Sequence, residues 1–277
     1  MENEKVESDF WAEYPKLWRA LDGSESIVRN IRRDHRKDDH RLFELAYSCA
    51  MAPPHFKNGV IDVANWEGAL FHARTMNDFR GVVKLVVDGY AQQAACVAAA
   101  LYENALFACC LFGDSESRKR YASGKIPGAS DLTKKHIQIN ERLRGKEADL
   151  RYRELYSHYK WLCQLKHPTK SAASHSASGT KVADGVYVIM AFPRSINDDA
   201  SMQDTVLMCS ILRLLDSAFA FAKSTRIPES DPQFKKMEEL RSECYGLMKA
   251  MVMGNAPLPV SLSGSKFSEE YRNLRDG

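Results

Sequence analysis

The sequence lacks the short motifs by which several classes of enzyme are recognised. It contains no HExxH or CxxC pair, no GxxxxGK[ST] phosphate loop, no GxGxxG dinucleotide fingerprint and no GxSxG elbow. The run from Asp34 to His40 offers side chains that could ligate a metal, but the arginines around it oppose a cation. We therefore expect neither a metal site nor a cofactor.

Features typical of secreted, repetitive or strongly charged proteins are also missing. The N-terminus, MENEKVESDFWAEY, is acidic and has no apolar core, so it does not resemble a secretory signal. We find no repeat of the solenoid type. The seven cysteines are odd in number and lie mostly on apolar helical patterns, which is typical of reduced thiols in a cytoplasmic protein. The formal net charge of +3 neither requires nor excludes a nucleic-acid partner.

The stretch from Gly89 to Phe112 is the feature around which we expect the chain to fold. It is apolar almost all the way round a helix, and such a helix is usually buried in the middle of a bundle. From Ala94 to Leu101 it contains only Ala, Cys, Val and Leu, and alanine has the highest helix propensity. Gln92, Gln93, Glu103 and Asn104 argue against a membrane span.

The carboxylate of Glu103 on this helix has two possible environments. If it is buried, it needs a partner from elsewhere, such as an Arg or a His. His167, at the end of a later helix, could supply that partner and would first of all cap its own helix. If Glu103 lies at the helix edge, water is enough. A weaker alternative is a small-ligand pocket around Glu103, His167 and Tyr102.

Helical periodicity over most of the chain predicts an all-α fold. About eight helices form a multi-helix bundle around the central stretch, with at most one short extended segment near 186–192 and a loop over 169–184. We expect an N-terminal helical pair over 1–58, a bundle over 59–254 and a tail over 255–277. The other expected helices are Asp9–Leu21, a helix from Ser24 or Ser26 to about Met51, Asn65–Val87, Leu132 to about Arg144, Glu147–Lys166, Thr205–Ala222 and Pro232–Met253.

A row of cations in the second of these helices could contact phosphates. Arg29, Arg33, Arg36, Lys37 and His40 recur at spacings of four, three and four, so they share a helix face. Aspartates intervene and lower the net field. The favoured interpretation is therefore a solvated face held by ion pairs, and RNA contact is the alternative.

The helix Glu147–Lys166 holds the densest set of candidate catalytic residues. A His beside an Arg could serve RNA cleavage, because His moves the proton of a hydroxyl and Arg stabilises charge on the phosphate. Glu154 and His158 are one turn apart and share a face. Arg153 and His158 are five residues apart, so they diverge by roughly 140° on helical geometry. They converge only if the helix end unwinds or a second subunit contributes, and otherwise His158 is a surface or interface histidine.

Two segments resemble parts of a known group of helical proteins. DGYAQQAACVAAALYENALFACCLFGD resembles the GY-x-A-…-R-x-x-x-E-A segment of a family of uncharacterised prokaryotic proteins. RYRELYSHYKWLCQLKHPTKSAASH resembles that family's later helix, which ends in a Ser/Lys-x-His-Pro-Ser/Thr signature, and Thr205–Ala222 resembles its closing helix. The resemblance covers roughly Val83 to Lys223. The fold that it implies is similar to that of the HEPN superfamily (higher eukaryotes and prokaryotes nucleotide-binding).

The resemblance implies a helical, commonly dimeric protein that binds or cleaves RNA without a metal, in a prokaryotic defence or toxin–antitoxin system. The HEPN motif is an Arg followed by four to six residues and a His, and Arg153 to His158 fits it, with Glu154 orienting the pair. Ala99 stands where the family carries an Arg, which favours a non-catalytic descendant. The rival hypothesis is a helical interaction module, either a homodimer or an antitoxin-like partner of a protein encoded nearby. We expect a cytoplasmic location in either case.

Overall fold

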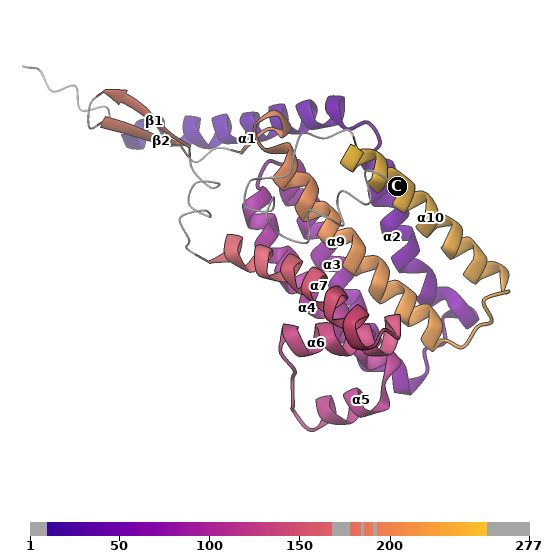
Figure 1. Cartoon of the computed structure of the whole chain (residues 1–277). Coiled ribbons are helices and arrows are strands. Elements are labelled where there is room, and N and C mark those ends of the chain that lie inside the picture. The colour runs from indigo at the N-terminus through magenta and orange to yellow at the C-terminus, as the bar shows by residue number, and fades with distance from the viewer. Residues whose placement is uncertain (1–9, 168–177, 184–185, 191–192, 254–277) are drawn as a thin grey trace, which may run out of the picture.

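The computed structural model describes residues 10–167, 178–183, 186–190 and 193–253, and these fold as an all-α bundle with one small hairpin (Figure 1). The predicted fold class is therefore confirmed. The helices are α1 (Phe10–His35), α2 (Asp39–His55), α3 (Trp66–Val87), α4 (Ala91–Gly113), α5 (Ser115–Ala122), α6 (Ala129–His136), α7 (Gly145–Lys166), α9 (Ile196–Ser224) and α10 (Pro232–Met253), with short turns η1 (Phe56–Gly59), η2 (Val63–Asn65) and the π-helical η3 (Ile137–Glu141).

The central helix of the bundle is α4, as the sequence predicted. It packs against α3, α9, α7 and α6, and it is buried on nearly every side. Leu101, Leu106 and Leu111 are fully buried, and each such side chain contributes about 1.5–3 kcal/mol by leaving water. The alanines between them let the neighbouring helices approach closely, so α4 holds the rest of the bundle in place.

One hydrophobic core joins α4 to helices from both ends of the chain. Leu42, Leu45 and Cys49 of α2 belong to the same cluster as α3, α4, α9 and α10. The N-terminal helical pair therefore shares the core of the bundle through α2. The predicted boundary at residue 58 stays a prediction, and the expected tail over 255–277 lies outside the described residues.

Two helices are long and apolar enough to cross a membrane by length and composition alone. They are α4 and the part of α9 from Ala200 to Ser224, and most of each lies buried against other helices. The burial accounts for their apolar character, because a core helix of a bundle has the same composition as a membrane span.

The first helix differs from its prediction. The sequence predicted a break at Asp22-Gly23, but α1 continues through both residues to His35. An exposed Gly in a helix costs only about 1 kcal/mol relative to Ala, which the rest of a 26-residue helix tolerates. The chain breaks at 36–38 instead, where Asp39 turns back to bind Arg32.

Two further helices differ in their bounds: α9 begins at Ile196 rather than Thr205, and the helix predicted from Leu132 to about Arg144 is α6 followed by η3.

The region after α7 also differs from its prediction. The extended segment predicted near 186–192 is β2 (Val186–Met190), which pairs in antiparallel fashion with β1 (Ser178–Ala183). The first strand falls in a stretch predicted to be loop, because its Ser- and Lys-containing sequence has no apolar alternation. The remainder of that predicted loop, 169–177 and Asp184, lies outside the described residues.

Candidate functional site

A group of charged side chains converges inside the bundle between α6, η3, α7 and α9. Buried polar groups are costly unless they are paired, so a cluster of this size is the strongest candidate for a functional site. We call these residues the charged cluster: His136, Glu141, Arg151, Glu154, His158, Arg213 and Asp216.

The π-helical turn η3 creates the first part of the charged cluster. In an α-helix, Glu141 would point well away from His136, which lies five residues earlier. The wider π turn brings the two together, so that His136 Nε2 is 3.6 Å from Glu141 Oε1. The same nitrogen lies 3.9 Å from Asp216 Oδ2 on α9. His136 is thus placed between two carboxylates, at ion-pair rather than hydrogen-bond distance.

Arg151 ties α7 to the π turn. Its Nε donates to both carboxylate oxygens of Glu141 at 3.1 and 3.0 Å, and its Nη1 donates to Glu154 Oε2 at 2.8 Å. Burial alone would raise the pKa of Glu141, but His136 and Arg151 outweigh it and lower this pKa to about 2. Glu141 is therefore ionised at any physiological pH.

Arg213 is the most buried cation of the charged cluster. Its side chain is only 3% exposed, its Nη2 lies 3.0 Å from Asp216 Oδ2, and its guanidinium lies 5.5 Å from the centre of the Tyr102 ring. Its Nε and Nη1 make no hydrogen bond within the described part of the chain. Because one carboxylate is its only ion-pair partner among the described residues, this buried guanidinium leaves positive charge near the neighbouring side chains.

His158 lies beside this positive charge. It is 3% exposed, and burial, followed by the charges of Arg213 and Arg151, holds the pKa of His158 well below its usual range. The ring is therefore neutral at pH 7. A neutral imidazole can accept a proton, but here it is enclosed by α7 and its neighbours rather than open to a substrate.

The structure does not bring together the two residues predicted to carry catalysis. Arg153 is exposed on α7, whereas His158 is buried. Glu154, the predicted orienting residue, instead binds Arg151. Arg151 precedes His158 by seven residues, or two helical turns, and shares its face. That spacing was visible in the sequence, whereas the contributions of His136, Arg213 and Asp216 depend on packing between helices.

Of the two environments expected for Glu103, the structure has the one at the helix edge. Glu103 is exposed and accepts a hydrogen bond from the hydroxyl of Tyr159. Burial and this hydrogen bond raise the pKa of Tyr159. Tyr102 is buried and donates to Leu155 O at 2.9 Å, while His167 is exposed. Consecutive residues on a helix point about 100° apart, so Tyr102 faces the interior while Glu103 faces outward, and a pocket shared with His167 stays a prediction.

The cationic row near the N-terminus is divided by the break between α1 and α2. Arg29 pairs with Asp88 at 2.9 Å and Arg36 with Asp204 at 2.8 Å, as the ion-pair interpretation expects. Arg33 and Lys37 are exposed. Sequence reasoning missed Arg32, which is buried and binds Asp39, Gln203 and Asp204. Its only local signal is its place four residues after the buried Val28.

Comparison with known proteins identifies no relative: no protein-family model, no curated protein and no solved structure matches this chain. Within the described ranges, no group of three or more His, Cys, Asp and Glu side chains is arranged to hold a metal ion.

Proposed function

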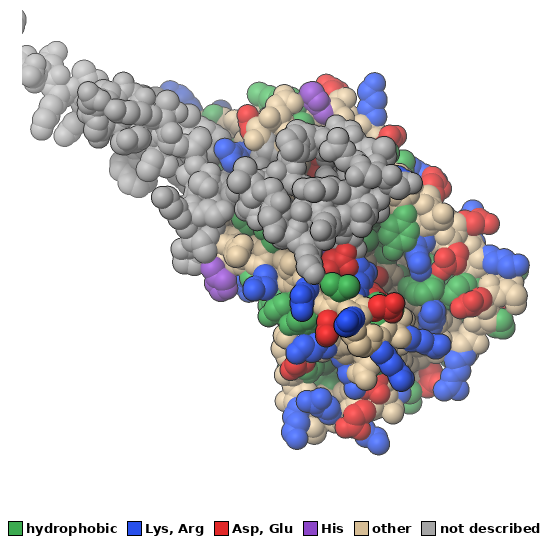
Figure 2. All heavy atoms as spheres, viewed as in Figure 1, with side chains coloured by type: hydrophobic (Ala, Val, Ile, Leu, Met, Phe, Trp, Pro, Cys, Tyr) green, Lys and Arg blue, Asp and Glu red, His purple; other side chains and the backbone are tan. Residues whose placement is uncertain are grey.

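We propose that this chain is a HEPN-like helical protein that binds RNA over α5, α6 and the start of α7 and does not cleave it. Residues 115–146 contain nine Lys and Arg against three Asp and Glu, whereas the whole chain has a net charge of only +3. Phosphate contacts need such a local excess of cations. Figure 2 shows blue Lys and Arg side chains on the lower lobe, where α5 and α6 lie in Figure 1. Seven of the nine cations are exposed: Lys119, Arg120, Lys125, Lys134, Arg142, Arg144 and Lys146.

A hollow on this basic surface is the observation that carries the proposal. It has a volume of about 620 Å³, and Lys134, Arg144 and Tyr152 are among the side chains that line it. Lys134 Nζ lies 5.2 Å from the centre of the Tyr152 ring, and Tyr152 stacks on Tyr156 with ring centres 5.3 Å apart. Proteins that bind single-stranded nucleic acid commonly place cations beside aromatic rings, because the cations bind phosphates and the bases stack on the rings.

The charged cluster supports binding without cleavage. A catalytic His must reach the proton that it transfers, and His158 is enclosed and separated from the exposed Arg153. The charged cluster is instead suited to joining α6, α7 and α9 beneath the basic surface.

The test of RNA binding compares two double charge reversals of equal size. Fluorescence anisotropy with a labelled single-stranded RNA would be measured for the wild type, for Lys134→Glu with Arg144→Glu, and for Arg33→Glu with Lys37→Glu. We expect binding that weakens with salt, a loss of at least about tenfold in the first variant and little change in the second. No binding by the wild type, or equal losses in both variants, would remove the proposal.

The test of cleavage uses the same RNA with a metal chelator. We expect intact RNA after incubation with the wild type. Cleavage that disappears in a folded Arg151→Lys or His158→Asn variant would restore the metal-independent ribonuclease hypothesis and assign it to the charged cluster.

A second candidate function, a helical interaction module, is favoured by one apolar surface. Val60, Val63, Trp66 and Leu70 lie within eleven residues of one another and are 73%, 87%, 54% and 50% exposed. A homodimer or a partner encoded nearby could cover them, in the cytoplasmic defence setting that the resemblance implies. Sedimentation of the wild type against Trp66→Glu distinguishes the homodimer, which this substitution would dissociate.

A further inference from the structure

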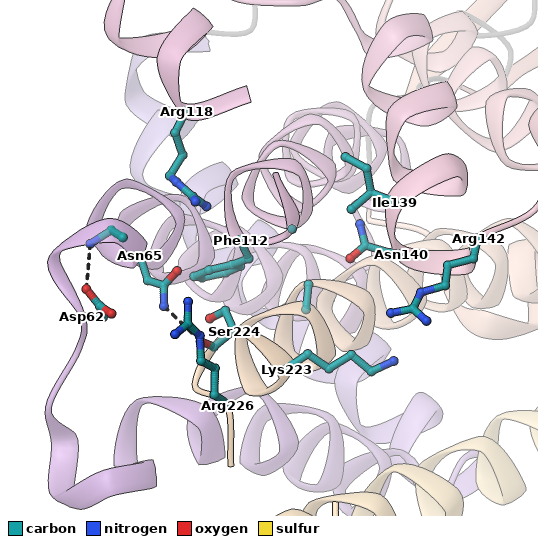
Figure 3. Close-up of a pocket in the computed structure, with 13 residues that line it drawn as sticks. Asp62, Asn65, Phe112, Arg118, Ile139, Asn140, Arg142, Lys223, Ser224 and Arg226 are labelled. Carbon is teal, nitrogen blue, oxygen red and sulfur yellow. Dashed lines mark hydrogen bonds between the residues drawn. The ribbon is translucent and has the colours of Figure 1, made fainter. Parts of the chain in front are cut away.

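A second hollow lies where α4 and α9 end, and its walls are basic. It has a volume of about 310 Å³ (Figure 3) and we call it the α4–α9 pocket. One carboxylate, Asp62, is among its lining residues. Its four cations come from four different places: Arg118 from α5, Arg142 from the residue after η3, Lys223 from the last turn of α9 and Arg226 from the residues after α9.

Three of these cations are not needed to satisfy the helix ends. The last carbonyls of helices attract cations, which could explain such residues at this position. Here, however, Leu111 O already accepts from Arg118 Nη1 at 2.6 Å, and Ser224 O accepts from Asn65 Nδ2 at 3.3 Å. Among the described residues, no carboxylate comes within 4.0 Å of the charged groups of Arg142, Lys223 and Arg226. The Nζ of Lys223 lies 4.4 Å from the centre of the Phe219 ring.

The backbone at two of these cations is strained. Arg142 and Arg226 both have φ of 58°, in the left-handed region that Gly and Asn adopt more readily than other residues. Asn58 is the only other non-glycine residue with a positive φ in the described ranges. Arginine at both positions indicates that the charged side chain is required there, although Gly or Asn would adopt this backbone conformation with less strain.

The remaining walls offer an apolar surface beside the charge. Phe112 lines the α4–α9 pocket and stacks on Phe221, with ring centres 4.5 Å apart and planes at 14°. Ile139 lies next to Asn140 in the wall of the pocket (Figure 3). Below these two residues in that view, the ends of the Lys223 and Arg142 side chains extend toward one another. Charge and apolar surface therefore border the same hollow.

We propose that the α4–α9 pocket binds a phosphate monoester, with its phosphate between Arg142 and Lys223 and its organic part against Phe112 and Ile139, while Arg226 adds positive charge from the side of Asn65. Four cations opposed by one carboxylate, Asp62, suit a dianion, which a terminal phosphate is and a backbone phosphodiester is not. The volume lies at the lower end of the range for small-molecule sites. A free phosphorylated metabolite and the phosphorylated 5′ end of an RNA share this chemistry. The proposal does not depend on RNA binding at the basic surface.

The first experiment measures binding of small ligands by calorimetry with the full chain. Ribose 5-phosphate, inorganic phosphate and unphosphorylated ribose would be titrated into the wild type and into Arg142→Asn with Arg226→Asn. Because Asn tolerates the left-handed backbone, this variant removes charge without straining the turns. The control, Arg33→Asn with Lys37→Asn, removes the same charge from exposed positions outside both the α4–α9 pocket and the basic surface.

We expect ribose 5-phosphate to bind the wild type and the control equally, to bind the pocket variant at least tenfold more weakly, and ribose not to bind. Thermal unfolding would show that both variants are folded. Equal weakening in the control, or binding of ribose as tight as that of ribose 5-phosphate, would overturn the proposal.

The second experiment separates the two sources of the phosphate. The anisotropy of one RNA would be compared with a 5′-phosphate and with a 5′-hydroxyl. A preference for the 5′-phosphate that the pocket variant loses supports an RNA end as the source. Equal binding of both RNAs, together with binding of ribose 5-phosphate, supports a free metabolite. If RNA binds regardless of its 5′ end and no phosphorylated small molecule binds, the pocket proposal fails while RNA binding at the basic surface stands.

Discussion

Arg32 and Asp204 form a buried ion pair across 172 residues of sequence, with Arg32 Nη2 3.3 Å from Asp204 Oδ1. The two side chains are only 3% and 1% exposed. Arg32 also donates through Nε to Asp39 at 2.7 Å and through Nη1 to Gln203 at 2.7 Å. One guanidinium therefore joins the end of α1, the start of α2 and the first third of α9, and it fixes the corner at which the chain leaves its first helix.

Replacing Arg32 should destabilise the fold strongly. Arg32→Met leaves the buried carboxylates of Asp39 and Asp204 without this cation, and removing one partner of a buried ion pair costs about 3–5 kcal/mol. Arg36, which is 2.8 Å from Asp204, should keep the loss near the lower end of that range. Urea unfolding would measure it, with the exposed neighbour substitution Arg33→Met as the control. Equal losses of unfolding free energy in the two variants would show that the buried ion pairs of Arg32 do not stabilise the fold.

The helices were predictable from the sequence wherever local pattern decides the structure. The apolar run of α4, the spaced apolar residues of α3 and the Pro at the start of α10 each specify a helix without help from distant residues. The corner between α1 and α2 was not predictable, because it depends on Asp204, far along the chain. The π turn η3 likewise depends on Arg151 and Asp216 holding Glu141 and His136 in place.

The candidate site was predictable only in part for the same reason. Arg151, Glu154 and His158 share a face of one helix, and their spacing alone places them together. The sequence could not show that Arg213 lies beside His158, since they meet only when α7 packs near α9. It also could not decide which side of α4 faces outward, so Glu103 was expected to be buried or exposed with equal reason.

The pKa of Glu141 predicts how one substitution depends on pH. The folded-state pKa of about 2 lies below the ordinary value of 4.5, so the unfolded chain binds more protons between those values. The stabilisation, on the order of 3 kcal/mol, is therefore present above pH 4.5 and is lost as the pH falls toward 2. Glu141→Gln should destabilise the protein at pH 6 and much less at pH 2.5, as measured by urea unfolding. Glu147→Gln, at an exposed position in α7, should have little effect at either pH.

The buried His72 predicts a second pH dependence in a different range. Its Nε2 donates to Ala50 O at 2.8 Å and its Nδ1 lies 2.9 Å from Ser217 Oγ. Burial lowers the pKa of His72 to about 4, although the bond to Ala50 opposes this. Because the unfolded histidine titrates near 6.5, stability should fall as the pH drops from 6.5 toward 4.

The expected loss from His72 is about 2 kcal/mol at pH 5 relative to pH 7. His72→Gln keeps a donor for Ala50 O but cannot be protonated, so its stability should change less over this interval. Some slope should remain in the variant, because the pKa of the buried His158 is also lowered. Identical pH slopes for the wild type and His72→Gln would contradict the argument.

Gly68 provides a test that links packing to the α4–α9 pocket. A Cβ at Gly68 would lie 2.7 Å from the ring of Phe112, closer than packed carbon atoms approach, and α3 and α4 are in contact along their length. Gly68→Ala should therefore cost about 1–3 kcal/mol through overpacking, against a gain of about 1 kcal/mol in helix propensity. In Gly246→Ala on α10 the new Cβ meets nothing within 4 Å, so the propensity gain should appear alone and raise the unfolding temperature. Because Phe112 also lines the α4–α9 pocket, Gly68→Ala should weaken binding of ribose 5-phosphate and Gly246→Ala should not. The geometry therefore requires that Gly68→Ala lower both stability and affinity, and that Gly246→Ala raise stability and leave affinity unchanged.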